Sequence, residues 1–264
     1  MDKVTEWRKD FPSFHDEVEL LMTNDTTQSI EKIKYRFYSK PEFNERLQRP
    51  VLYILDAHHL FVNSRALVCG RGIDARGITK QAWLDVAKSK QTPLSVPMVM
   101  DLIDKQSNAL AQTTYSLEVE QLMISLGYPQ EATFCRYMRR WYEAEDEPSI
   151  PASERLQRRL DLRKFLLEGV NFFKFPPYGS HVRGVPLVMF EGLLTNIDRR
   201  IQLHALVPGS SYNVRAPTSL DSENFFSEFQ AMDPKGTGVL FADEIPKAME
   251  NASFLLNSRV NPDR

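Results

Sequence analysis

Five consecutive apolar residues, Val51 to Leu55, precede Asp56 and limit the folds that the sequence can adopt. The run is short, contains β-branched and aromatic residues, and is bordered by Pro50 and by the carboxylate. Such a run is typical of a strand that is buried on both faces of a sheet. A carboxylate at the C-terminal end of a central strand lies where open α/β sheets bind their ligands. Asp56 is therefore a candidate metal-binding or catalytic residue, with N-capping of the next helix as the alternative.

Most of the remaining chain has apolar residues at helical spacing, so the predicted fold class is α/β and mostly helical. Two segments, Val185–Glu191 and Ile201–Val207, favour strands instead, and Ala66–Gly70 fits either a strand or the end of a helix. The predicted helices are Glu17–Met22, Ile30–Phe37, Gln81–Ala87, Val96–Ser107, Ser116–Leu126, Gln130–Glu145, Ser153–Gly169 and Leu220–Met232.

Composition excludes several classes of protein. The formal net charge of −2 gives no global attraction to nucleic acid, so any DNA contact has to come from a local patch. Cys69 and Cys135 are far apart and belong to no metal-binding pattern, which argues against a zinc site and a disulfide framework. The N-terminus has no signal-peptide pattern and no stretch is long enough to span a membrane, so we expect an intracellular protein without membrane contact. The sequence does not predict an oligomeric state.

Positive charge is concentrated in the two predicted helices between residues 130 and 169. Arginines gathered on one helix face can contact the phosphates of DNA. Several glutamates lie among them, so a solvated face of mixed charge is the alternative. The candidate nucleic-acid-binding residues of this region are Arg136, Arg139, Arg140, Arg155, Arg158 and Arg159.

Two short blocks resemble a known family. The first, Asp56-Ala-His-His59-Leu60 followed by Arg65, has the form Asp-x-x-His-Leu-x-x-x-x-Arg. The second, Ser219-Leu-Asp-Ser-Glu223-Asn-Phe-Phe-Ser227, places a glutamate before two phenylalanines at the start of a predicted helix. These blocks resemble the second and third carboxylate blocks of the RNase H-like transposases of the P-element and THAP type. The resemblance covers roughly residues 50–230.

The resemblance implies a partial RNase H-like sheet with a large helical insertion. It implies a helical N-terminal segment over 1–49, a core over 50–79 and 171–232, the insertion over 80–170, and a C-terminal part over 233–264. Family members cleave and join DNA with two Mg²⁺ ions that three carboxylates hold. Asp56 and Glu223 would be the second and third carboxylates, while His59 and Arg65 would support the helix behind Asp56 or contact phosphate. A DNA partner brings with it the expectation of a nuclear location.

The chain departs from the family at the first carboxylate. That aspartate lies on an earlier strand of the family's sheet, and the sequence before Asp56 shows no apolar strand that ends in aspartate. We therefore expect an incomplete or inactive member, from a fragment of a longer reading frame or a domesticated remnant. A further assignment makes Asp56 the first carboxylate and Asp198 the second.

Residues 233–244 resemble the loop of an EF-hand. Asp233 occupies the first position, Gly238 the sixth and Glu244 the twelfth, where the motif places a carboxylate ligand, a sharp turn and a bidentate glutamate. Thr237 and the carbonyl of Val239 would complete a calcium site. Lys235 replaces the usual carboxylate at the third position and no second copy is visible, so a plain helix–turn–helix is the alternative. A calcium-binding or interaction protein is the corresponding alternative function.

Overall fold

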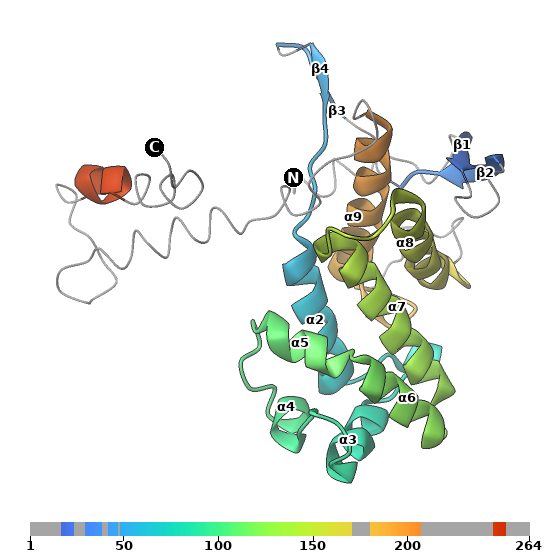
Figure 1. Cartoon of the computed structure of the whole chain (residues 1–264), viewed down its shortest axis with the longest axis vertical. Helices are drawn as coiled ribbons and strands as arrows, with labels where there is room; N and C mark the ends of the chain where they lie inside the picture. The colour runs from blue at the N-terminus through green and yellow to red at the C-terminus, as the bar shows by residue number, and fades with distance from the viewer. Residues whose placement is uncertain are drawn as a thin grey trace. The chain divides into compact units, whose positions relative to one another are not determined.

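The computed structural model describes residues 17–23, 30–38, 42–46, 48–170, 180–206 and 245–251. The chain divides into two compact units, Met1–Ala216 and Pro217–Arg264. In the second unit the described residues form one helix, over 245–251. In the first unit they form a mostly helical body with small two-stranded sheets (Figure 1). None of the described helices combines the length and the apolar content that crossing a bilayer requires.

The N-terminal segment contains strands where the sequence analysis predicted helices, so that prediction is wrong for Glu17–Met22 and Ile30–Phe37. Strands β1 (Glu17–Thr23) and β2 (Ile30–Arg36) pair antiparallel, with Val18 opposite Tyr35 and Leu20 opposite Ile33. In the sequence, Val18, Leu20 and Met22 recur with the period of two that is typical of a strand, whereas Ile30 and Ile33 keep the spacing of a helix. Over segments this short, apolar residues at helical spacing can also fit the period of a strand, so periodicity does not distinguish the two.

Two further antiparallel pairs complete the described strands. β3 (Glu42–Asn44) pairs with β4 (Arg49–Val51), and β5 (His181–Val182) pairs with β6 (Val185–Pro186). Each sheet among the described residues has two strands, and none contains the Val51–Leu55 run as a central strand.

The helices form the body of the first unit. Helix α7 packs against α6 and α8, while α2 contacts α3, α4, α5, α7 and α9 (Figure 1). In chain order they are α2 (Ala57–Gly70), the 3₁₀-helix η1 (Asp74–Arg76), α3 (Lys80–Ser89), α4 (Val96–Met100), α5 (Asn108–Thr114), α6 (Leu117–Ser125), α7 (Pro129–Asp146), α8 (Ala152–Leu167) and α9 (Leu187–Leu206).

The aromatic stripe of α7 lies in the core, as its spacing predicts. Phe134, Met138 and Trp141 are buried, and each is 2% exposed or less. Residues at i, i+4 and i+7 share one face of a helix, and this face of α7 packs into the body. Gly127 follows α6 and has a φ of +85°, the left-handed conformation expected of a glycine that ends a helix.

Helix α9 replaces the two strands that the sequence analysis predicted over Val185–Glu191 and Ile201–Val207. Only Val185 and Pro186 are in a strand, and residues 187–206 form one helix. Phe190, Leu193 and Ile197 follow helical spacing and are buried. Every residue from Met189 to Gln202 is buried, so α9 has no solvent-facing side over that range. The buried residues include Asn196, Asp198 and Arg200, so polar residues along this helix do not mark a solvent-facing side.

The predicted helix Val96–Ser107 ends at Met100, where α4 stops. Leu102 and Asp104 then adopt φ angles of +47° and +42°, which a right-handed helix does not allow. The guanidinium of Arg65 donates to main-chain carbonyls of this segment, including that of Asp104 at 2.9 Å. A buried donor from α2 thus satisfies carbonyls that a longer helix would have satisfied internally.

Both cysteines are buried and free. Burial raises the pKa of the Cys69 thiol to about 12 and raises that of Cys135 further. Because the thiolate is the nucleophile, these groups are unsuited to nucleophilic catalysis.

Candidate functional site at the start of helix α2

Asp56 is the N-cap residue of α2. Its backbone is extended, with φ −66° and ψ 122°, and its Oδ1 accepts a hydrogen bond from the His58 amide at 2.8 Å. The prediction that Val51–Leu55 is a central strand is wrong, because only Val51 belongs to a strand and Leu52–Asp56 has no regular secondary structure. The geometry of Asp56 is that of an N-cap, the alternative role that its sequence position predicts.

Polar side chains from four helices converge beside Asp56. Tyr142 on α7 lies between His58 Nδ1, 2.6 Å from its hydroxyl, and Asn108 of α5, whose Nδ2 donates to the same oxygen at 2.5 Å. On the other side, Asn196 of α9 donates to the carbonyl of Leu55 at 2.8 Å. Hydrogen bonds from α7 and α9 therefore hold the start of α2, and Asn108 of α5 bonds the tyrosine of α7.

His58 is the residue of this cluster that the sequence reasoning missed. The family pattern singles out His59, which is exposed, whereas His58 is half-buried. His58, Phe61 and Arg65 are spaced by three and four residues, so they lie along one face of α2, and the first two contact Tyr142 of α7. Phe61 stacks on Tyr142 with ring centroids 4.1 Å apart and planes at 9°. The spacing of His58 and Phe61 along the helix was the sequence signal that could have identified His58.

Arg65 is fully buried, and its guanidinium is committed to three main-chain carbonyls. It donates to Met98 at 3.1 Å, Ile103 at 2.9 Å and Asp104 at 2.9 Å. Of the two roles considered for it, support of the helix behind Asp56 fits this position. Contact with phosphate does not fit, because a side chain with no exposed surface cannot reach one.

The expected metal ligands are described only in part. Asp56 lies in the described region, whereas Glu223 and the calcium-loop residues Asp233, Thr237, Val239 and Glu244 lie outside it. Within the described ranges, no three His, Cys, Asp or Glu side chains are grouped as a metal site requires. Asp198, the further carboxylate considered, is buried in α9, where its Oδ1 accepts from Arg163 Nε at 3.0 Å and its other oxygen accepts from the Tyr38 amide.

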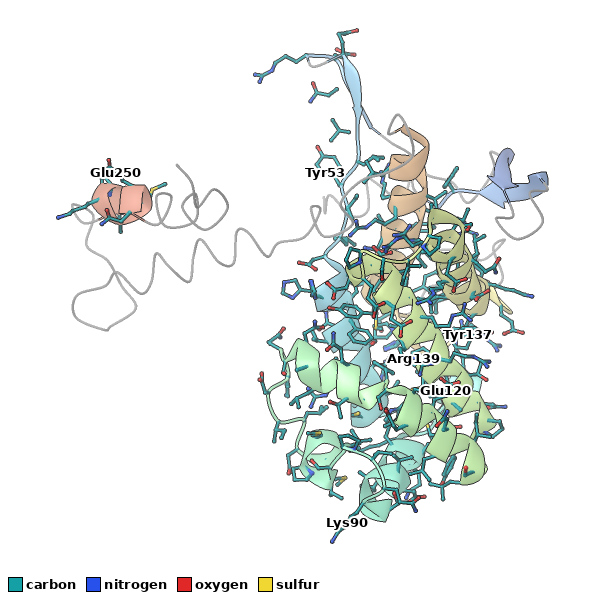
Figure 2. The ribbon with its side chains drawn as sticks, in the orientation of Figure 1. Tyr53, Lys90, Glu120, Tyr137, Arg139 and Glu250 are labelled. Atoms are coloured by element: carbon teal, nitrogen blue, oxygen red, sulfur yellow. The ribbon has the colours of Figure 1, made fainter. Side chains whose placement is uncertain are left out.

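Three of the candidate arginines form a network of ion pairs with glutamates on α6, α7 and α8. Their side chains are half-buried. Figure 2 labels Arg139 and Glu120, one of these pairs. The pairs are Arg139–Glu120 at 2.6 Å, Arg139–Glu143 at 3.6 Å, Arg140–Glu154 at 3.0 Å, Arg158–Glu143 at 2.5 Å and Arg158–Glu154 at 2.7 Å.

Two further candidate arginines are buried. Arg155 donates to the carbonyls of Ala144 and Glu147, which end helix α7. Arg159 pairs with Glu145 at 2.7 Å, and both side chains are less than 5% exposed. These two arginines join α8 to the end of α7, a structural role that leaves them inaccessible to a phosphate backbone.

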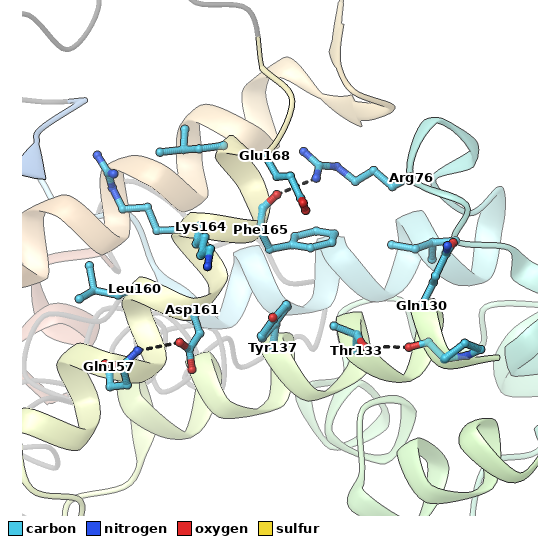
Figure 3. A pocket seen from close by; sticks show the side chains of 14 residues that line it. Arg76, Gln130, Thr133, Tyr137, Gln157, Leu160, Asp161, Lys164, Phe165 and Glu168 are labelled. Carbon is cyan, nitrogen blue, oxygen red and sulfur yellow. Dashed lines mark hydrogen bonds between the residues drawn. The ribbon is translucent and has the colours of Figure 1, made fainter. Parts of the chain in front are cut away.

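Arg136 is the exposed member of the six. Its guanidinium carbon lies 5.9 Å from the ring centroid of Tyr137. Tyr137 lines a groove of about 1140 Å³ between α7 and α8, shown in Figure 3. The exposed Lys164 also lines this groove, whereas Arg76 is held there over the Phe165 ring at 4.5 Å.

A smaller cavity of about 370 Å³ lies at the junction of α5, α6 and α7. Phe61 and Tyr142 line it, together with Arg139 and the carboxylates of Glu118 and Glu143. The aromatic pair that supports the start of α2 therefore borders this cavity as well.

Comparison of the chain with protein-family models, curated proteins and solved structures finds no match.

Proposed function

We propose that this chain is a transposase-derived, RNase H-like protein that contacts nucleic acid without cutting it. The observation that carries the proposal is the helical nature of the interval between the two motif blocks. Helices α3 to α8 occupy residues 80–167, between the block of Asp56 and that of Glu223. The resemblance implies a helical insertion at this place in the chain.

The proposed lack of cleavage follows from the carboxylates that the sequence supplies. Asp56 and Glu223 are the two side chains that would hold Mg²⁺, and Mg²⁺ there would stabilise the attacking and leaving oxygens of a phosphodiester. A two-metal site needs more carboxylate oxygens than two side chains provide. The Asp56 carboxylate is also engaged in capping α2.

The proposed contact with DNA is weak and independent of sequence. Of the six arginines considered, five are engaged with carboxylates or carbonyls, so little of their charge is presented to solvent. Arg136 and Lys164 are exposed and lie on α7 and α8, beside the groove that contains Tyr137. Basic side chains beside an aromatic ring suit a nucleic-acid backbone with a stacked base.

We expect no nicking of supercoiled plasmid by this chain in Mg²⁺ or in Mn²⁺. The reason is the shortage of carboxylate ligands described above. The assay follows conversion of supercoiled to open-circular DNA on a gel, with Asp56→Ala and Glu223→Ala run in parallel. Metal-dependent nicking by the parent chain that both variants lose would contradict the proposed inactivity and would identify the site.

DNA binding should fall steeply with salt, because release of counterions from phosphates drives it. Replacing both Arg136 and Lys164 with alanine should lower the slope of log K against log salt by about 2, at roughly 0.9 for each phosphate contact. A salt series with a labelled duplex measures the slope, and Lys105→Ala, an exposed lysine in the loop after α4, is the matched control. No binding even at low ionic strength would remove nucleic acid from the proposed function.

A further inference from the structure

The extended segment from Val51 to Leu55 has the sequence of a buried strand, but in the described structure two of its residues are exposed and three are half-buried. Tyr53 is 62% exposed and Leu55 is 46% exposed. Figure 2 labels Tyr53 on the stretch that leads from β4 into α2. Alternating exposure along an extended apolar segment is the property of a strand with an uncovered face. No other stretch of the described chain combines this sequence pattern with such exposure.

The main chain of this segment lacks partners over the same residues. Within the described structure, Leu52, Tyr53 and Ile54 make no main-chain hydrogen bond, and Leu55 accepts one from Asn196. Unpaired amides and carbonyls along an extended apolar segment are a template for another strand. Natural edges are blocked by charges, bulges or covering loops, and Val51 to Leu55 contain no charge.

The segment is fixed at both ends, so pairing would order few additional residues. At its start, Val51 is the last residue of β4 and is opposite Glu42 of β3. At its end, Asn196 binds the Leu55 carbonyl, and an added Cβ on Gly192 of α9 would lie 3.5 Å from Leu55 Cδ1. A segment already held in the binding conformation loses less entropy on association.

We propose that two copies of this chain associate by antiparallel pairing of Val51–Leu55 about a two-fold axis at Tyr53. In this register Tyr53 faces the Tyr53 of the partner, Leu52 faces Ile54, and Val51 faces Leu55. Every cross-strand pair is apolar and no like charges oppose each other. An isologous contact of this kind closes as a dimer.

A second copy would also stabilise the β3–β4 hairpin. A single two-stranded hairpin is marginally stable in water, and three or more strands are needed for independent stability. One edge of β4 pairs with β3. Its other edge has no paired strand among the described residues, and the chain continues from β4 into Tyr53 and Ile54. Pairing of two copies joins their two hairpins into one four-stranded sheet, so the additional strands come from a second copy of the same chain.

Sedimentation velocity over a concentration series tests this pairing with two variants that place opposite charges at Tyr53. The full chain should sediment as a dimer that dissociates on dilution. Tyr53→Lys and Tyr53→Glu should each be monomeric at the same concentrations, because each places like charges opposite one another at the axis. An equimolar mixture of the two variants should restore the dimer. Circular dichroism of each variant should match that of the parent chain, since Tyr53 is exposed.

Val188→Lys is the matched control, because Val188 is an apolar residue on α9 that is 80% exposed. This variant should remain dimeric. A parent chain that is monomeric at all concentrations overturns the proposal and leaves the segment for a strand from a different protein. Dimers that persist in both Tyr53 variants, or a mixture that stays monomeric, overturn the pairing at Tyr53.

Discussion

Glu145→Ala is expected to lower the free energy of unfolding by about 3–5 kcal/mol, as removal of one partner from a buried ion pair does. The Glu145 side chain is 1% exposed and lies 2.7 Å from Arg159 Nε on α8 and 2.7 Å from Arg200 Nε on α9. The Arg159 contact has hydrogen-bond geometry, whereas the Arg200 contact has the distance of an ion pair without the angles. Loss of this carboxylate deprives two buried guanidinium groups of the anion that they share.

Urea unfolding followed by circular dichroism measures the effect. Glu154→Ala is the matched control, because Glu154 also contacts two arginines but is 40% exposed. Exposed ion pairs contribute about 0–1 kcal/mol, so the control should unfold close to the parent chain. Glu145→Gln, which keeps the shape and loses the charge, should fall between the two. Equal stability of Glu145→Ala and Glu154→Ala would contradict the assigned role of the buried pair.

The sequence predicts most of the helical body because local periodicity determines it. The apolar stripe of α7 and the stop at Gly127 follow from spacing and from a left-handed turn, and both require only neighbours in sequence. Helix α9 was mistaken for strands because it is buried on all sides. Its polar residues, such as Asp198 and Arg200, are buried as well, and the short apolar runs at its two ends do not separate a buried helix from a strand.

The same limit applies at Asp56. The run Val51–Leu55 has the composition of a central strand, yet it continues beyond β4 without a paired strand in the described part of the chain. Whether such a segment pairs depends on strands elsewhere, which periodicity within the segment does not report. The N-capping of α2 by Asp56, in contrast, depends on residues two positions apart, and the sequence analysis included it.

The roles of the arginines required tertiary contacts. Arg136 and Arg159 look alike in the sequence, but the first is exposed and the second is paired with Glu145 inside the protein. The density of arginines in two helices therefore predicted a DNA-binding face. In the structure, most of these arginines instead join helices to one another through ion pairs and hydrogen bonds. Glutamates among the arginines were a sequence signal for ion pairing, but the alternative drawn from them was a solvated face of mixed charge, and the burial of Arg159 with Glu145 was not predicted.

Arg65→Met is expected to lower the free energy of unfolding by about 3 kcal/mol, because each buried carbonyl that loses its donor costs about 1–3 kcal/mol and the effects are not additive. Arg65 holds the segment after α4, where Leu102 and Asp104 have positive φ angles. Arg65→Lys should recover part of the loss, since an ammonium group cannot reproduce the planar fork of the guanidinium.

Arg71→Met is the control at the C-cap of the same helix, because the Arg71 side chain is exposed and its hydrogen bond to the Gly184 carbonyl is long, at 3.4 Å. Surface substitutions of this kind usually change stability by less than about 0.5 kcal/mol. Amide hydrogen exchange should show the largest loss of protection in residues 101–107, where the carbonyls of Ile103 and Asp104 lose their donor. If Arg65 instead served to contact phosphate, Arg65→Met would leave unfolding unchanged and weaken DNA binding. That result would contradict the structural role of Arg65, because loss of a buried guanidinium that stabilises this turn must lower the free energy of unfolding.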